Sequence, residues 1–307
     1  GEAFTQGRDM AESMPNTDGP EVSHTFLSDL WSLGKPRLSS LVIFTAGGGM
    51  FLAGGSPNIE TVLAGMFGTT LVVCSANSLN NYIERESDKL MTRTRTRPLP
   101  AGRMQPWIAL VYGIVLLSIA LPWMVLSTTA LAAGLAAFAW VVYVFVYTPM
   151  KRRSWLSVLA GGLAGAMPPL IGWTAVRGTI DPGGLVLFLI LFMWQLPHTF
   201  AIGLYRKDDY AAAGLKVLPT EQSDAITRQH IMTWTVGLVA SNFWAVHLGM
   251  GGALTLAGTL GLGGVFLWKA WTGLKTEGGP IWARDLFLFS LVYLSGMFVL
   301  MALDHVI

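Results

Sequence analysis

One short stretch, residues 77–88, gathers oxygen-bearing side chains at a spacing that could hold a metal ion. It directly follows an apolar run, and in a helix that continues from that run residues four apart lie only about 40° round from one another. Asn80, Glu84 and Asp88 then form what we call the acid–amide ladder, with Asn77 and Asn81 beside it. Two carboxylates and an amide suit a hard cation such as Mg²⁺. The alternative is an ordinary charged helix end, whose acids are solvated or paired with neighbouring basic residues.

The next segment, residues 91–100, alternates arginine with threonine. Arg93, Arg95 and Arg97 could clamp a diphosphate, because a guanidinium matches phosphate oxygens with two parallel hydrogen bonds. They could also bind anionic lipid headgroups, and the two roles do not exclude each other. Carboxylates cannot hold a diphosphate directly, but they can through a bridging Mg²⁺ with arginines alongside. The ladder and the basic segment together therefore predict one metal–diphosphate site.

A histidine and an acidic pair come later in the chain. His198 ends the sequence Trp-Gln-Leu-Pro-His inside an apolar run, and Asp208 and Asp209 follow shortly after that run. An ionisable side chain within a membrane-spanning helix is costly, so it indicates a functional role by default. His198 could bind a metal or haem iron or accept a proton; the alternative is a hydrogen-bonded core histidine near a proline kink. Asp208 and Asp209 could offer a second carboxylate group to a metal–diphosphate cluster facing the ladder.

Long apolar helices must position these residues. Of the 307 residues, 52% are hydrophobic and only 12% are charged, about half the charged share of a soluble domain. The apolar residues fall into blocks of roughly the 20 residues that span a bilayer, although the first block is short and glycine-rich. Small residues recur within them, as expected where membrane helices pack closely. The nine predicted spans are Leu38–Leu52, Thr61–Asn81, Trp107–Leu126, Ala130–Tyr147, Leu156–Val176, Leu185–Tyr205, Ile231–Leu248, Leu254–Trp271 and Leu286–Ala302.

Positive charge is divided unevenly between the two sides of this predicted bundle. When the spans are threaded in order, all of the 20 lysines and arginines except Arg177 fall on one side. The positive-inside rule makes that side cytoplasmic, with the N-terminus inside and the C-terminus outside. The loops on that side carry the motifs described above, so function is expected there.

The chain is predicted to divide into a polar tail and one membrane domain. Residues 1–28 contain no apolar run and are interpreted as a flexible N-terminal tail without a secretory signal. Residues 29–307 are predicted to form the transmembrane domain. The single cysteine, Cys74, lies in an apolar block, is interpreted as a packed thiol, and excludes an internal disulfide or a cysteine-based zinc site.

Several blocks, in order, resemble the UbiA-type intramembrane prenyltransferases. Asn80 to Asp88, continued by Met91 and residues 93–99, resembles the first aspartate-rich motif of that family. The resemblance covers essentially everything after the tail. There are two departures: Glu84 and Glu86 stand where such enzymes more often carry aspartate, and the second motif has adjacent aspartates instead of DxxxD. The other matching blocks, which resemble a branch of the family that acts on haem, are 35–37, 147–152, 168–172, 194–198, 205–210, 217–219 and 283–287.

The resemblance implies an all-α integral membrane fold, a nine-transmembrane-helix bundle around a central lipid-accessible cavity capped on the cytoplasmic side. It implies transfer of farnesyl from farnesyl diphosphate to a vinyl group of haem B, making haem O, with Mg²⁺ as cofactor. His198 would lie beside the porphyrin as axial ligand or base. The expected metal ligands are Asn80, Glu84 and Asp88, with Asp209 or Asp208. The expected diphosphate, propionate and other substrate contacts are Arg37, Asn77, Asn81, Arg93, Arg97, Tyr147, Lys151 and Arg206.

Other interpretations of the same residues stay open. A UbiA-type enzyme with another aromatic or tetrapyrrole acceptor would differ only in the blocks around His198 and Asp209. A cation-coupled membrane transporter is the alternative from a different class, but transporters often show internal repeats and acids near the bilayer midplane, and neither is evident here. A haem-binding assembly factor without catalysis would not need the ladder.

The location and partners follow from the same observations. The absence of an arginine-rich, acid-poor leader favours a bacterial cytoplasmic (inner) membrane over a mitochondrial inner membrane. The lipid bilayer, farnesyl diphosphate and haem B are the expected partners, together with haem A synthase or a terminal oxidase assembly. No nucleic-acid partner is expected.

Overall fold

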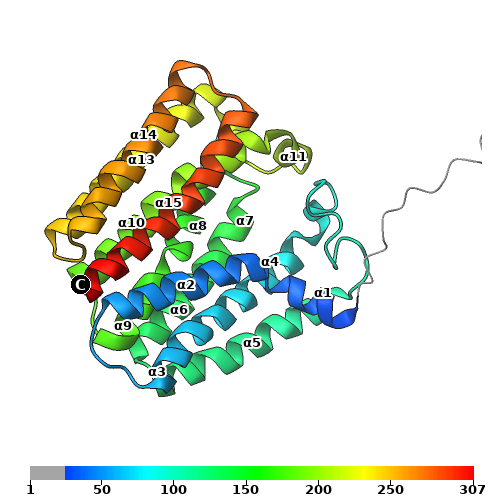
Figure 1. Cartoon of the computed structure of the whole chain (residues 1–307). Coiled ribbons are helices and arrows are strands. Elements are labelled where there is room, and N and C mark those ends of the chain that lie inside the picture. The colour runs from blue at the N-terminus through cyan, green and yellow to red at the C-terminus, as the bar shows by residue number, and fades with distance from the viewer. Residues whose placement is uncertain (1–24) are drawn as a thin grey trace, which may run out of the picture.

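The computed structural model describes residues 25–307, which form helices and no strands (Figure 1). A helix or a run of continuous helices occupies each of the nine predicted apolar segments. The long elements are α2 (Pro36–Leu52), Ile59–Asp88 (α3, η1 and α4), α5 (Pro106–Ser127), Ala130–Met150 (α6, η2 and α7), Ser157–Arg177 (α8 and α9), α10 (Pro182–Tyr205), α13 (Asp224–His247), α14 (Ala253–Lys275) and α15 (Pro280–Val306). The short helices are α1 (Phe26–Leu33), α11 (Lys207–Ala212) and α12 (Leu218–Glu221).

Seven of these elements are long and apolar enough to cross a membrane. The other two are α2, which has 17 residues, and α13, which carries Asp224, Arg228 and His230 near its start. An all-helical, multi-pass membrane protein is therefore confirmed, and the count of nine crossings stays a prediction. Residues 1–24, most of the predicted tail, lie outside the described residues, and α1 begins within the interval assigned to that tail.

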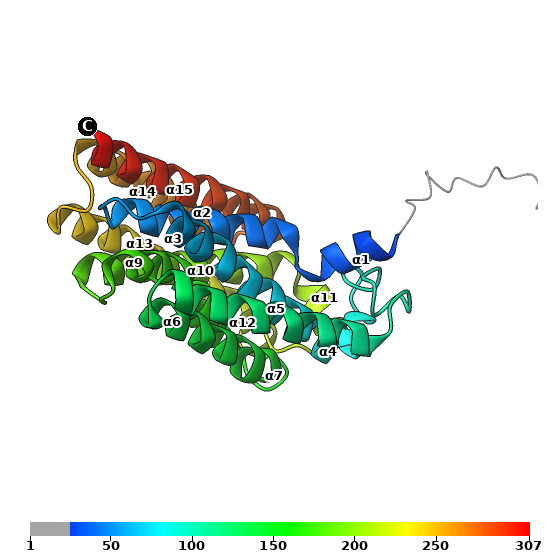
Figure 2. The same ribbon diagram turned by 90° about the horizontal axis from the view of Figure 1, so that it is seen from below.

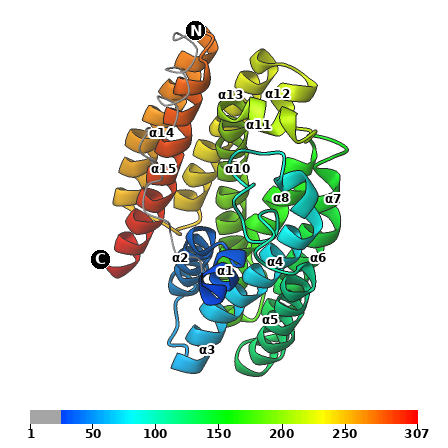
Figure 3. The same ribbon diagram turned by 90° about the vertical axis from the view of Figure 1, so that its right-hand side faces the viewer.

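The helices form two groups that share an interface. α10, α13, α14 and α15 pack on one another around fully buried side chains such as Phe266 and Tyr293. α2, α4, α5, α6 and α9 form the second group, and the two groups meet where α9 contacts α10 and α2 contacts α15. Figure 3 shows α14 and α15 on one side of the molecule and α5 and α6 on the other.

Glycines allow the backbones of α2 and α9 to approach closely. A Cβ atom added to Gly49 would lie 2.1 Å from the carbonyl oxygen of Pro169, and one added to Gly172 would lie 2.0 Å from that of Ala46. Only glycine leaves room for backbones at this separation, which is how membrane helices gain packing energy without a hydrophobic drive. The expectation of small residues at helix contacts is confirmed here.

Three of the predicted spans are not regular α-helices. η1 (Ala64–Gly68) is a π-helical turn within the span Ile59–Asp88. η2 (Val142–Tyr147) is a π-helical turn within the span Ala130–Met150. Ala166 separates α8 (Ser157–Gly165) from α9 (Met167–Arg177), with two prolines directly after the break. Such irregularities change which face of a helix a side chain occupies, and π-turns often lie at functional sites.

The charged connections gather at one end of the bundle. Figure 2 shows α1, α11 and the connection after α4 at the end opposite the C-terminus of α15. That connection, residues 89–105, returns over the end of α4: the Thr94 hydroxyl donates to the Asp88 carbonyl at 2.9 Å, and Arg103 pairs with Asp29 of α1 at 3.0 Å. The fold therefore encloses the end of α4 that carries the ladder.

Candidate active site

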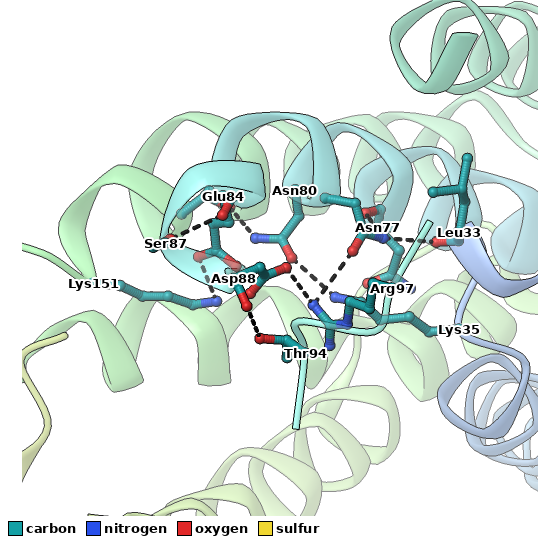
Figure 4. Close-up of polar contacts among 12 residues, drawn as sticks. Leu33, Lys35, Asn77, Asn80, Glu84, Ser87, Asp88, Thr94, Arg97 and Lys151 are labelled. Carbon is teal, nitrogen blue, oxygen red and sulfur yellow. Dashed lines mark hydrogen bonds and ion pairs between the residues drawn. The ribbon is translucent and has the colours of Figure 1, made fainter. Parts of the chain in front are cut away.

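The acid–amide ladder lies on the inward face of α4 (Thr69–Asp88) (Figure 4). Asn80, Glu84 and Asp88 expose 0%, 7% and 1% of their surface. These values contradict the interpretation of a solvated helix end for Glu84 and Asp88. Glu86 fits that interpretation instead, because it points outward and pairs with Lys89 at 2.8 Å.

Each of the three ladder residues contacts a cationic side chain from a different part of the chain. A buried carboxylate needs a charged or strongly hydrogen-bonding partner, and the structure supplies one to both carboxylates of the ladder. The contacts join Lys35 Nζ to Asn80 Oδ1 at 2.9 Å, Lys151 Nζ to Glu84 Oε1 at 2.9 Å, and Arg97 Nη1 to Asp88 Oδ2 at 2.8 Å.

Two carboxylate oxygens at this end have unused acceptor capacity. Asp88 Oδ1 and Asp209 Oδ2 are buried and have no hydrogen-bond partner within residues 25–307. An unsatisfied buried acceptor costs about 1–3 kcal/mol, so such atoms favour binding of a cation or water. Asp209 Oδ1 accepts from the Thr92 backbone N–H at 3.2 Å, which joins α11 to the connection after α4, whereas Asp208 is exposed. Asp209 is therefore the inward member of the adjacent pair.

Protein side chains alone do not surround a metal at this site. In the described part of the chain, no group of three or more His, Cys, Asp or Glu residues lies close enough to hold a metal ion. Mg²⁺ normally keeps several waters and takes one or two carboxylates plus substrate phosphates, so a sparse set of oxygens is compatible with it. The unpaired oxygens of Asp88 and Asp209 fit that pattern.

The two lysines next to the ladder differ in electrostatic state. Burial, reinforced by the charges of Arg97 and Lys151, lowers the pKa of Lys35 to about 7. Burial opposes the charged form of Lys151 too, but the attraction of Glu84 outweighs it and holds the pKa of Lys151 well above its usual value. Within the described residues Lys35 hydrogen-bonds only to a neutral amide. Positive charge is thus in excess beside it, as expected where an anion binds.

Asn77 and Asn81 contact the protein backbone. Asn77 Nδ2 donates to the Gly34 carbonyl at 3.3 Å, and Asn81 Nδ2 donates to the Leu33 carbonyl at 3.2 Å. These bonds hold the α1–α2 connection, where Lys35 adopts a left-handed φ of 52°. The two amides, expected as substrate contacts, thereby place the Lys35 ammonium group.

A cavity of about 350 Å³ opens in front of the ladder. Among the predicted site residues, Asn80, Glu84, Asp88, Arg93, Arg97, Tyr147 and Lys151 line it. Sequence reasoning missed eight further polar or aromatic lining residues, which are Lys35, Tyr143, Trp155, Ser157, Thr199, Phe200, Tyr210 and Lys216. Apolar side chains complete the wall, so charged, aromatic and apolar groups line the same cavity.

The π-helical turn η2 shapes one wall of this cavity. It presents both Tyr143 and Tyr147 to the cavity, and Lys151 Nζ lies 4.4 Å from the Tyr147 ring centre. Thr148, directly after the turn, donates to the Tyr143 carbonyl at 2.8 Å and accepts from Asn80 Nδ2 at 3.2 Å. The amide of Asn80 is thereby oriented with Oδ1 toward Lys35.

The remaining predicted residues lie outside the cavity lining. Arg37 is exposed, and Arg206 lies over the Tyr205 ring at 4.4 Å. His198 sits between α10 and α15, where its Nδ1 is 2.7 Å from Ser290 Oγ. The next residues along α10, Thr199 and Phe200, do line the cavity. The structure therefore brings the ladder together with Arg93, Arg97 and Lys151. The predicted residues that do not line the cavity are Arg37, Asn77, Asn81, His198, Arg206, Asp208 and Asp209.

The fold and the site define an all-helical membrane protein with a buried, charge-lined chamber at one end. Such a chamber suits a polyanionic ligand with an apolar tail. The chain belongs to the UbiA prenyltransferase family, which matches residues 41–292.

Known proteins agree with this assignment. The chain is 46% identical, over 296 residues that cover 96% of it and 98% of the relative, to the protoheme IX farnesyltransferase of Myxococcus xanthus (strain DK1622). Its fold is similar to a solved digeranylgeranylglyceryl phosphate synthase, with a TM-score of 0.76, 16% identity, and coverage of 91% of this chain and 98% of that one. The fold is also similar to that of a UbiA homolog from Archaeoglobus fulgidus bound to GPP and Mg²⁺, with a TM-score of 0.62 and 14% identity. That match covers 90% of this chain and 100% of the homolog. The two structures support the fold alone.

Proposed function

We propose that this protein transfers a farnesyl group from farnesyl diphosphate to a vinyl group of haem B and so makes haem O. C1 of the farnesyl group bonds to the terminal vinyl carbon, water adds its oxygen to the inner carbon, and diphosphate and a proton leave. The observation that carries the proposal is the buried ladder with its opposed cations at the charged end of an apolar cavity. The name of the Myxococcus xanthus relative supports haem B as the acceptor.

The charged end of the cavity would hold the diphosphate. The residues proposed to hold Mg²⁺ are Asn80, Glu84 and Asp88, with Asp209. When bound, Mg²⁺ would neutralise charge that develops on the departing diphosphate. The relative from Archaeoglobus fulgidus that binds GPP and Mg²⁺ supports this cofactor.

The cations of the site would exchange partners when substrate arrives. Arg97 and Lys151 neutralise Asp88 and Glu84 in the substrate-free protein. With a metal held by those carboxylates, the same guanidinium and ammonium groups would be available to donate to diphosphate oxygens. Donors already held in place stabilise a leaving group at little reorganisation cost. Arg93, at the rim of the cavity, adds positive charge on the entry side.

The apolar part of the cavity lining would receive the farnesyl chain and the flat acceptor. Trp155 and Phe200 supply ring surfaces that can pack against a porphyrin, and Tyr143 and Tyr147 supply two more beside the ladder, close to Lys151. Apolar walls would limit water there, which would protect an allylic cation until the vinyl group reaches it. The ladder lies at one end of α4, away from the middle of the span, and this position favours an enzyme over a transporter with a midplane cation site.

The orientation in the membrane follows from the same charge distribution. We place the site at the cytoplasmic face of a bacterial inner membrane, because the basic side chains gather at the ladder end and Arg177 is the last residue of α9, at the far end. Haem A synthase or a terminal oxidase assembly would then use the product.

The decisive experiment supplies the purified protein with haem B, farnesyl diphosphate and Mg²⁺ and weighs the haem by mass spectrometry. We expect a haem heavier by one farnesyl group plus one hydroxyl group. Chelating the metal with EDTA should stop product formation, and adding Mg²⁺ back should restore it. A modified acceptor other than haem, or no prenylated product in any membrane mimetic, would contradict the proposed reaction.

Replacing Lys35 by methionine tests the residue that the structure adds to the site. We expect the KM for farnesyl diphosphate to rise roughly 10- to 100-fold, because the variant loses one charge-assisted hydrogen bond to the diphosphate. The change in kcat should be smaller. Lys35→Arg should keep part of the affinity. Lys89→Met, which removes an exposed lysine paired with Glu86, is the matched control. An unchanged KM in Lys35→Met would show that this lysine does not contact the diphosphate.

A further inference from the structure

The contacts of His198 assign a role to Ser290, on the facing helix α15. We propose that Ser290 is a positioning residue: it fixes His198 as the tautomer that carries its proton on Nδ1 and so leaves Nε2 free to bind the iron of the haem acceptor. This inference rests on the proposed function for the identity of the acceptor. It adds a residue that neither the motifs nor the cavity lining identifies.

The tautomer follows from counting protons around Ser290. Its hydroxyl has one hydrogen, and the Phe287 carbonyl, which can only accept, lies 2.6 Å from Ser290 Oγ. Ser290 Oγ must therefore accept in its second short contact, at 2.7 Å from His198 Nδ1. The donor in that contact is the Nδ1–H group. A neutral imidazole with a proton on Nδ1 has a lone pair on Nε2.

The ring is also held on its two faces. Trp194 stacks on His198 at 4.5 Å between ring centres with an interplanar angle of 29°, and the Phe287 ring lies at 4.8 Å. Trp194 is itself fixed, because its Nε1–H donates to the Ser290 carbonyl at 2.6 Å. Ser290 therefore orients the imidazole through its hydroxyl and the stacking tryptophan through its backbone.

One nitrogen of the imidazole has no partner in the described part of the chain. His198 Nε2 has no hydrogen-bond partner among residues 25–307, although the side chain is mostly buried between α10 and α15. A histidine that binds a metal almost always donates its other N–H to a fixed acceptor, which sets the tautomer and the ring orientation. The pair His198–Ser290 has this arrangement before any metal arrives. It lies one residue before Thr199 and Phe200, which line the cavity.

The test is a titration of the purified, full-length protein in nanodiscs with ferric haem B, followed by absorption and electron paramagnetic resonance spectra. We expect an imidazole-ligated spectrum in the unchanged protein and its loss in His198→Ala. Ser290→Ala should weaken haem binding by roughly 10- to 100-fold and alter the spectrum, the usual effect of losing the partner of a metal-binding histidine. Ser290→Thr, which keeps the hydroxyl, should restore much of both.

Ser241→Ala is the matched control. Ser241 is a buried serine of α13 whose hydroxyl donates only to its own helix, to the Gly237 carbonyl at 2.7 Å. Its loss should leave haem affinity and spectrum unchanged. The inference is overturned if Ser290→Ala behaves like Ser241→Ala, or if His198→Ala keeps the spectrum of the unchanged protein. Either result can occur while haem O is still made, so failure of this inference is separable from failure of the proposed reaction.

Discussion

Replacing Asp88 by asparagine should lower the rate of haem O formation by roughly 10²- to 10³-fold or more, a loss typical of removing one electrostatic contact to a transition state. Asp88 is 1% exposed, pairs with Arg97 through Oδ2, and leaves Oδ1 free for a metal. Asparagine has nearly the same shape but no charge. Its amide nitrogen would repel either the guanidinium or the metal, and the protein should still insert and purify.

Turnover of the purified variant, measured by mass spectrometry of the haem, checks this prediction. Glu86→Gln is the matched control, since it removes an exposed carboxylate from the same helix and should leave turnover nearly unchanged. Near-normal turnover in Asp88→Asn would remove this carboxylate from the metal site.

The second large effect is a loss of stability, expected when the contact between α2 and α9 is disturbed. Replacing Gly49 by alanine would place a Cβ atom 2.1 Å from the Pro169 carbonyl oxygen. A backbone atom cannot rotate aside, so α2 and α9 must separate along their contact. Overpacking of a closely packed interior typically costs about 1–3 kcal/mol, and more where backbone is involved. We expect a lower midpoint of thermal unfolding in detergent and a poorer yield of monodisperse protein.

The control for this variant is another glycine in a helix. A Cβ atom at Gly261 of α14 meets nothing within 4 Å, so Gly261→Ala should leave stability the same or raise it slightly, by less than about 1 kcal/mol. Gly172→Ala, at the same interface as Gly49, should repeat the loss, since its Cβ would lie 2.0 Å from the Ala46 carbonyl oxygen. Equal stability of the Gly49 and Gly261 variants would contradict a tight contact between α2 and α9.

The pairing of the ladder with cations has a consequence for catalysis. Three buried polar groups on one helix would be costly without partners, and the structure supplies a lysine or an arginine to each. The same cations are suited to a diphosphate. Each carboxylate of the ladder is thus already paired with a cation, and binding of a metal diphosphate would replace these internal ion pairs with external ones.

The amino-acid sequence by itself determined the all-helical membrane fold and the acid–amide ladder. Both depend on local patterns: apolar runs of spanning length, and a four-residue spacing that holds in any α-helix. The concentration of arginines after the second span was equally visible, as were the blocks that identify the family. These features need no knowledge of which helices touch.

The tertiary structure decided which groups complete the ladder. Lys35 reaches Asn80 from 45 residues away, in a connection that helical periodicity does not describe, and Thr148 orients Asn80 only because a π-helical turn precedes it. Packing also turned Asp209 inward and left Asp208 exposed, and it gave Asn77 a backbone partner.

His198 shows the same division between sequence and structure. A histidine in an apolar span is conspicuous in the sequence, but its tautomer is set by Ser290, 92 residues further along the chain. Contacts of this kind arise when helices distant in the sequence bring particular faces together. Local spacing constrains one helix at a time, so they could not be derived from it.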